Sequence, residues 1–128
     1  MNKLIIDITN EKIFLMIITK DDIYNITKEN TKINYEKLTL ILKDFLDSNN
    51  LKIEDIQKIY VNRGPGSFAG IRNSLSIVKA ISVARKVDYF CYSPEDFKDL
   101  KDVKYEDIPN LCDKFKIKKN LIKPIHLS

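Results

Sequence analysis

The sequence predicts an α/β domain built on a mixed five-stranded sheet with flanking helices. Three observations lead to this fold class. Short strand-like segments open the chain, helical and strand patterns then alternate, and a glycine-rich turn joins a strand to a long helix. The 128 residues suit one domain, and the hydrophobic fraction of 44% suits an ordinary globular core.

The opening segments predict three antiparallel strands over residues 3–8, 12–19 and 22–28. A short polar link, Thr9-Asn10-Glu11, joins the first two, which indicates a hairpin. Both of these strands carry nearly continuous apolar runs. Such runs are typical of strands covered on two faces, so we expect helices or other chain segments on both sides of the sheet.

The rest of the chain alternates helix and strand. A helix is expected over 34–48, with Asn34 as its N-cap and Asn49-Asn50 as its end. Its apolar residues share one side at helical spacing. They are Tyr35, Leu38, Ile41, Leu42, Phe45 and Leu46. Later elements are a strand over 57–62, a helix over about 68–86, a strand over 88–92, and a short helix capped by Ser93 with Pro94 at its first position.

This order of elements is that of one ribonuclease-H-like lobe, which the actin and sugar-kinase superfamily uses twice. We assign residues 1–100 to the lobe. Residues 101–128 form a weaker, charged segment with one helical turn around 111–115 and an apolar end, 121–127. We expect this segment to dock on the lobe as a tail.

Composition restricts the function classes. The net charge is +4 and the cations are mostly lysine, which leaves a lysine-rich RNA-binding module as one alternative. Cys91 and Cys112 lack metal or redox spacing, so we expect two buried thiols. Neither an apolar run of membrane-spanning length nor a signal-peptide core is present, so we expect a cytoplasmic protein with no membrane contact.

All three glycines of the chain lie within seven residues, between a strand and a helix. The candidate loop comprises Gly64, Pro65, Gly66, Ser67 and Gly70. One interpretation is an anion cradle, because free N–H groups at a helix N-terminus attract anions. The other is a tight turn needing positive φ or close backbone approach. No lysine follows as a Walker A loop requires. We expect Gly66 to be required for the loop geometry, with strain upon substitution if its φ is positive.

Residues 63–72 read RGPGSFAGIR, which resembles the RGPGSFTGxR signature of the TsaB (YeaZ) family apart from Ala69. Ile6-Asp7 and Tyr92-Ser93 resemble further family segments, so the resemblance covers about residues 1–100. It implies a non-catalytic subunit that works with a TsaD-like subunit and a TsaE-like ATPase in forming threonylcarbamoyladenosine beside the tRNA anticodon. The tRNA is reached only through the complex, and self-association is an alternative when the chain is alone.

The resemblance has two departures. The family has a second lobe for which this chain has no room, so the chain looks like a first lobe joined to the family's closing tail, with His126 in place of a tyrosine. Ser74, Ser76 and Ala80 also replace glycines of the family's helix. With His126 as its one histidine, the chain lacks the histidine metal motif of TsaD. We therefore expect no metal ligand, cofactor or catalytic residue.

The helix over 68–86 has more apolar surface than one sheet contact can cover. Arg72, Lys79 and Lys86 form a charged stripe, and Ile71, Leu75, Val78 and Ile81 suit the sheet. The other side predicts a partner interface, unless helix 34–48 covers it. The interface residues are Asn73, Ser76, Ile77, Ala80, Val83 and Ala84. We expect Ala80 to lie on the small side of the helix, opposite the charged stripe.

Asp7 ends the first strand, where the actin and sugar-kinase superfamily places a carboxylate near a metal–nucleotide. The following turn lacks glycine, so we do not expect nucleotide binding by this chain alone. A small phosphate- or nucleotide-binding enzyme that uses the glycine loop stays open as the alternative to a partner subunit.

Overall fold

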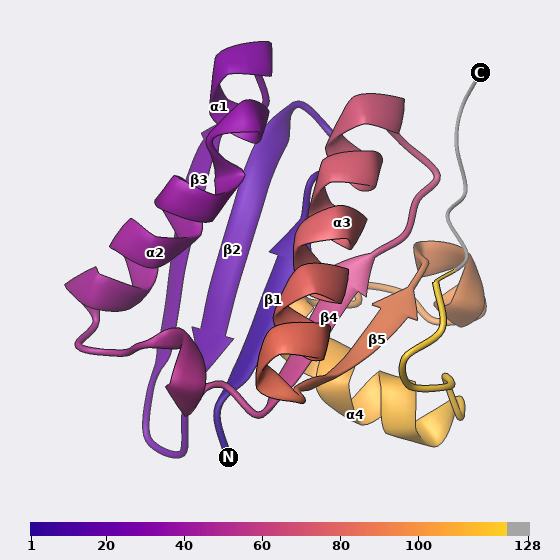
Figure 1. The fold of residues 1–128 in the computed structure, drawn as a ribbon. Helices are drawn as coiled ribbons and strands as arrows, with labels where there is room; N and C mark the ends of the chain where they lie inside the picture. Colours follow the sequence, from indigo (N-terminus) through magenta and orange to yellow (C-terminus); the bar gives the residue numbers. More distant parts are fainter. Residues whose placement is uncertain (123–128) are drawn as a thin grey trace.

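The computed structural model describes residues 1–122 and contains the predicted mixed five-stranded sheet (Figure 1). The strand order is β3-β2-β1-β4-β5. Most of the apolar end that we expected to dock, 123–127, and His126 with it, lie outside the described residues. The strands are β1 (Lys3–Asp7), β2 (Lys12–Ile18), β3 (Ile23–Glu29), β4 (Lys58–Asn62) and β5 (Asp88–Tyr92).

The strand pairing brings three polar residues to one edge of the sheet. β1 is antiparallel to β2, and β2 to β3, while β4 is parallel to both β1 and β5. Parallel strands end at the same edge, so Asp7, Asn62 and Tyr92 follow one another there. The glycine loop continues from this edge, because it follows β4 directly.

Two separate hydrophobic clusters cover the two faces of the sheet, as the apolar runs of β1 and β2 predict. Along β1 the side chains alternate: Leu4 and Ile6 pack under the helices, and Ile5 packs on the opposite face. The helical layer in front of the sheet in Figure 1 comprises α1 (Lys32–Glu36), α2 (Leu38–Ser48) and α3 (Phe68–Arg85). The opposite face is covered by the 3-10 helices Pro94–Phe97 and Tyr105–Asp107 and by α4 (Ile108–Lys114), and one further 3-10 turn, Ile53–Asp55, precedes β4.

The helix expected over 34–48 is two helices, and the assignment of Asn34 as its N-cap is wrong. Thr31 is the cap: its hydroxyl accepts a hydrogen bond from the N–H of Asn34 at 3.2 Å. The Asn34 side chain instead donates to the carbonyl of Glu29 at 2.9 Å, which ties α1 to the end of β3. Lys37 separates the two helices. The apolar side and the end at Asn49 are confirmed.

The segment after residue 100 contacts the sheet through more residues than its weak pattern indicated. Tyr105 stacks on Phe14 with ring centroids 4.0 Å apart, and Ile108 and Cys112 are buried in the same cluster. The helix α4 is longer than the single turn we expected. The division of the chain at residue 100 stays a prediction. Within residues 1–122, no helix has the length and apolar character needed to cross a membrane.

Both cysteines are buried and unpaired, as expected, and burial raises the pKa of each thiol from 9.0 to about 12. Burial also raises the pKa of Tyr60 and Tyr92.

These shifts predict alkaline destabilisation. Above about pH 9 the thiols of the unfolded chain lose protons while those of the folded chain keep them, so the free energy of unfolding falls as pH rises. We expect a loss of about 1–3 kcal/mol between pH 8 and pH 10 in urea unfolding under reducing conditions. A double variant, Cys91→Ala with Cys112→Ala, should be less stable at pH 8 but less sensitive to pH. Equal pH sensitivity in both proteins would contradict this assignment.

Candidate functional site

The glycine loop lies directly against the turn between β1 and β2. A Cβ added to Gly66 would lie 2.4 Å from the carbonyl oxygen of Thr9, far inside van der Waals contact. The same oxygen accepts a hydrogen bond from the N–H of Ser67 at 3.0 Å. Gly66 is therefore required by backbone proximity, because a side chain there would displace the Thr9 carbonyl from its hydrogen bond.

Gly64 and Gly70 have different roles from Gly66. Gly64 has a φ of 108° and is followed by a cis peptide bond to Pro65, so the positive φ lies here and not at Gly66. Gly70 is inside α3, where an added Cβ would lie 2.4 Å from the carbonyl oxygen of Ile8. Two glycines thus permit close approach and one permits the turn, which together place the N-terminus of α3 on the β1–β2 turn.

The N–H groups of the loop are largely engaged within the protein. Gly64 N–H donates to Asn62 Oδ1 at 2.9 Å, and Gly70 N–H donates to Ser67 Oγ at 3.3 Å. With Ser67 bonded to Thr9, three donors have partners, and Pro65 has no N–H to offer. This geometry favours the tight-turn interpretation over an anion cradle, which needs several free donors pointing to one place.

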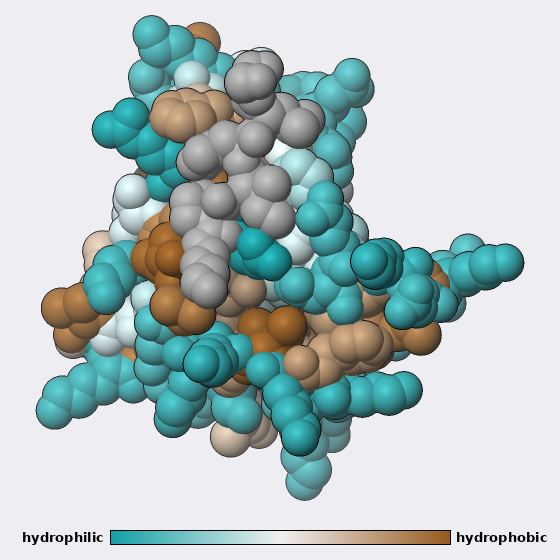
Figure 2. Space-filling model, turned by 90° about the vertical axis from the view of Figure 1, so that its right-hand side faces the viewer, coloured by the Kyte–Doolittle hydropathy of each residue, from teal (hydrophilic) through white to brown (hydrophobic). Residues whose placement is uncertain are grey.

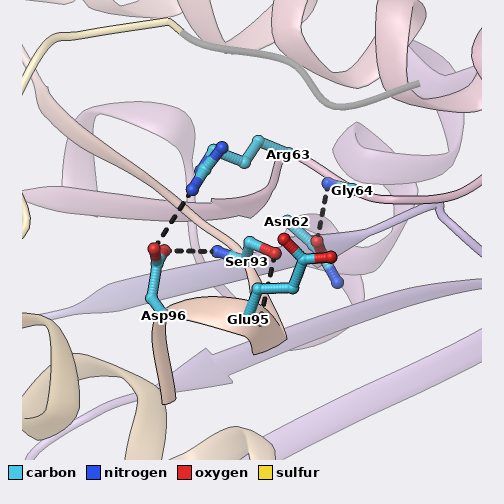
Figure 3. A network of polar contacts seen from close by, with 6 residues as sticks. All are labelled: Asn62, Arg63, Gly64, Ser93, Glu95 and Asp96. Carbon is cyan, nitrogen blue, oxygen red and sulfur yellow. Dashed lines mark hydrogen bonds and ion pairs between the residues drawn. The ribbon is translucent and has the colours of Figure 1, made fainter. Parts of the chain in front are cut away.

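A polar network connects the start of the loop to the end of β5 (Figure 3). Arg63 forms an ion pair with Asp96 at 3.1 Å, and both side chains are about four-fifths buried, which limits solvent screening. The second carboxylate oxygen of Asp96 accepts the N–H of Ser93 at 2.8 Å. Beside it, Asn62 accepts the N–H of Gly64 (Figure 3). The network therefore ties the start of the loop to the ends of both β4 and β5.

Asp7 is buried, and its carboxylate is occupied by donors from the chain itself. Oδ1 accepts the Thr9 N–H at 3.0 Å and the Thr9 hydroxyl at 2.6 Å. Oδ2 accepts Asn62 Nδ2 at 3.1 Å and the Tyr105 hydroxyl at 2.8 Å. Burial and then the nearby Asp7 charge raise the pKa of Tyr105, so this phenol stays a donor. Among residues 1–122 no group of three potential metal ligands is present.

This arrangement predicts opposite results for two tyrosines that line the same cavity. Tyr105→Phe removes a hydrogen bond to a buried carboxylate and should lower the free energy of unfolding by about 1.5–3 kcal/mol. Tyr92→Phe removes a buried hydroxyl that has no hydrogen-bond partner among the described residues, so we expect a change below about 0.5 kcal/mol or a gain. Urea unfolding of the two variants tests the difference. A larger loss for Tyr92→Phe would contradict the hydrogen-bond assignment.

The structure divides the predicted interface residues of α3 into two groups. Ser76, Ala80, Val83 and Ala84 are exposed, with Val83 70% exposed, while Asn73 is half-buried. Ile77 is also half-buried and packs against the core beneath the helices. Ile77 is therefore partly covered within this chain, whereas the exposed group is left uncovered by α2.

The exposed group forms one wall of a shallow apolar depression that we call the α3 groove. Sequence reasoning missed two of its apolar members, Phe68 and Ile122. Phe68 is 52% exposed, and its spacing of four from Arg72 on the helix was the available signal. The groove is lined by Phe68, Arg72, Leu75, Ser76, Lys79, Ala80, Val83, Ala84 and Ile122.

The expectation that the charged stripe lies opposite the small residues of α3 is wrong. Arg72 and Lys79 line the same groove as Ala80. The reason is that the face of α3 away from the sheet is wide enough to hold both sets. Figure 2, which shows the right-hand side of Figure 1, has brown hydrophobic atoms bordered by teal hydrophilic side chains.

Comparisons with known proteins agree with this architecture. Residues 29–91, 63 of the 128 residues, match the family model described as TsaD, tRNA N6-adenosine threonylcarbamoyltransferase. Two curated relatives are the tRNA threonylcarbamoyladenosine biosynthesis proteins TsaB of two Buchnera aphidicola strains. The Schizaphis graminum relative is 26% identical over 68% of this chain and 41% of its own length, and the Baizongia pistaciae relative is 30% identical over 54% and 31%. The chain thus spans less than half the length of these relatives.

Solved structures show the fold. YeaZ from Pseudomonas aeruginosa matches with a TM-score of 0.67 at 20% identity, over 72% of this chain and 43% of that protein. Thermus thermophilus RuvC matches with a TM-score of 0.54 at 12% identity, over 96% of this chain and 83% of RuvC. The fold is that of one ribonuclease-H-like lobe. Within that fold, the chain is similar to proteins of the TsaB (YeaZ) family.

Proposed function

We propose that this chain is a non-catalytic partner subunit of a TsaD-like enzyme that forms threonylcarbamoyladenosine beside the tRNA anticodon. The observation that carries the proposal is the exposed apolar groove on α3 of a TsaB-like lobe. Exposed apolar surface bordered by polar residues is typical of protein–protein contacts.

The proposed interface is the exposed part of α3. Ser76, Ala80, Val83 and Ala84 make the contact, and the half-buried Asn73 and Ile77 lie at its margin. A TsaE-like ATPase is a further partner, and tRNA is reached only through the complex. The division into a lobe, 1–100, and a docked tail, 101–128, belongs to the same proposal.

The non-catalytic part of the proposal is supported by Asp7. Four donors of the chain itself occupy its carboxylate, so it is not presented to a substrate. The glycine loop then has a structural role: Gly64, Pro65, Gly66, Ser67 and Gly70 seat α3 against the β1–β2 turn. No cofactor is required for this role.

Size-exclusion chromatography with a TsaD homologue, used as the TsaD subunit, tests the proposal. We expect the two chains to coelute, and we expect no ATP hydrolysis by this chain alone. Separate titrations with ATP, inorganic phosphate and tRNA test the alternatives. Turnover of ATP that is lost in Asp7→Ala would instead support a small enzyme, and tight binding of tRNA by the chain alone would support an RNA-binding module.

A further inference from the structure

The α3 groove is apolar, and its charged side chains are all positive. Its nine lining residues include two cations, Arg72 and Lys79, and no carboxylate. Both cations are exposed and are not among the ion-paired residues of the described chain. Phe68 and Val83 are exposed near the two ends of the same helix. A molecule that covers the apolar part of the groove must therefore also meet two unpaired positive charges.

We infer that the α3 groove takes an amphipathic helix of another protein, with acidic residues flanking the apolar stripe of that helix. This deepens the proposed function, on which it rests for the use of α3 as an interface, because it specifies the chemistry of the partner surface. Carboxylates placed beside Arg72 and Lys79 complement the groove, whereas apolar or basic residues there leave the cations unpaired or repelled.

The dimensions of the groove suit a helix. Its lining extends along α3 from Phe68 to Ala84, which at 1.5 Å per residue is roughly 24 Å, or about four helical turns. Ser76, Ala80 and Ala84 recur at a spacing of four, so small side chains form one continuous row between the larger ones. Such a row lets the ridge of a second helix approach closely, at an interaxial distance near the lower end of about 8–10 Å.

The charge pattern disfavours a second copy of this chain as the occupant. In a twofold-symmetric contact each groove meets the same surface of its partner, so both copies bring Arg72 and Lys79 to one interface. Four like charges would then surround the apolar contact without a carboxylate in either groove. The overall net charge of +4 on each copy adds to the repulsion.

Two designed peptides test the inference with the full chain. Each has roughly 21 residues, forms an amphipathic helix and carries the same leucine stripe, but one is flanked by glutamate and the other by lysine. By fluorescence anisotropy at about 50 mM salt we expect the glutamate peptide to bind about tenfold more tightly, and the difference to fall below about threefold at 500 mM salt.

A double variant, Arg72→Ala with Lys79→Ala, should remove most of this discrimination while the lysine peptide binds at least as well as before. The matched control, Lys20→Ala with Lys101→Ala, removes two exposed charges outside the groove. This control should keep the preference for the glutamate peptide.

Three outcomes would overturn the inference. Equal binding of the two peptides would show that charge does not select the occupant. Sedimentation that shows a dimer of the chain alone, weakened by Val83→Glu, would assign the groove to a second copy. Tighter binding of the glutamate peptide by the full-length Ile125→Asp variant would show that the end of this chain is the occupant of the groove. Peptide discrimination without binding of the TsaD subunit would contradict the proposed function only, so the two failures are distinguishable.

Discussion

Ala80→Lys should abolish association with the TsaD subunit and leave the fold of this chain intact. Ala80 is exposed, so in the free chain the introduced ammonium group is solvated. In the complex the same group would lie inside an apolar contact, unpaired and next to Lys79. Burying an unpaired charge costs several kcal/mol, so we expect affinity to fall at least about 100-fold.

Leu40→Lys is the control for this experiment. Leu40 is also an exposed apolar residue of the helical layer, at 53% exposure, but it lies on α2 and outside the groove. We expect it to leave affinity unchanged. Circular dichroism and size-exclusion chromatography of both variants, alone and with the TsaD subunit, give the answer. A normally folded Ala80→Lys protein that still coelutes would remove α3 from the interface.

Gly66→Val should lower the free energy of unfolding by about 3 kcal/mol, because the atom that its Cβ meets is a backbone oxygen. The Thr9 carbonyl cannot rotate away like a side chain, and moving it breaks the hydrogen bond from Ser67. For a chain of this size the midpoint of thermal unfolding should fall by roughly 10 °C.

Ala69→Val is the control, since Ala69 lies in the same segment, is half-buried and already carries a Cβ. It should cost less than about 1 kcal/mol through helix propensity. Similar melting curves for Gly66→Val and the unsubstituted chain would show that the loop moves away from Thr9 without cost. The test distinguishes close approach from torsional strain, because Gly66 does not have a positive φ.

Local patterns predicted the elements because each pattern reports a constraint that acts within a few residues. The apolar runs of β1 and β2, the helical spacing from Leu38 to Leu46 and the cap at Ser93 all correspond to observed features. The cap of α1 was missed because the local pattern does not distinguish between two residues that are both suited to the cap position. Thr31 and Asn34 are both good caps, and the contact of Asn34 with Glu29 decided between them.

The resemblance of the glycine segment to the TsaB signature identified the loop but not the role of each glycine. Gly64, Gly66 and Gly70 are indistinguishable in the sequence, because glycine permits both positive φ and close approach. The positions of Ile8 and Thr9, more than fifty residues earlier, assign close approach to two of them. In the same way Asp7 gains a partner, Tyr105, from the far end of the chain.

By itself the sequence determined the fold class, the order of the strands and helices, the glycine loop and the excess apolar surface of α3, since all of these follow from local composition and spacing. Only the tertiary structure decided which side of α3 stays exposed. Helix α2 packs near Ile81, Ile77 is half-buried in the core, and Arg72, Lys79 and Ala80 are left to share one groove. A helical wheel gives the angle between two residues, but the angle at which neighbouring elements cover the helix depends on contacts between distant parts of the chain.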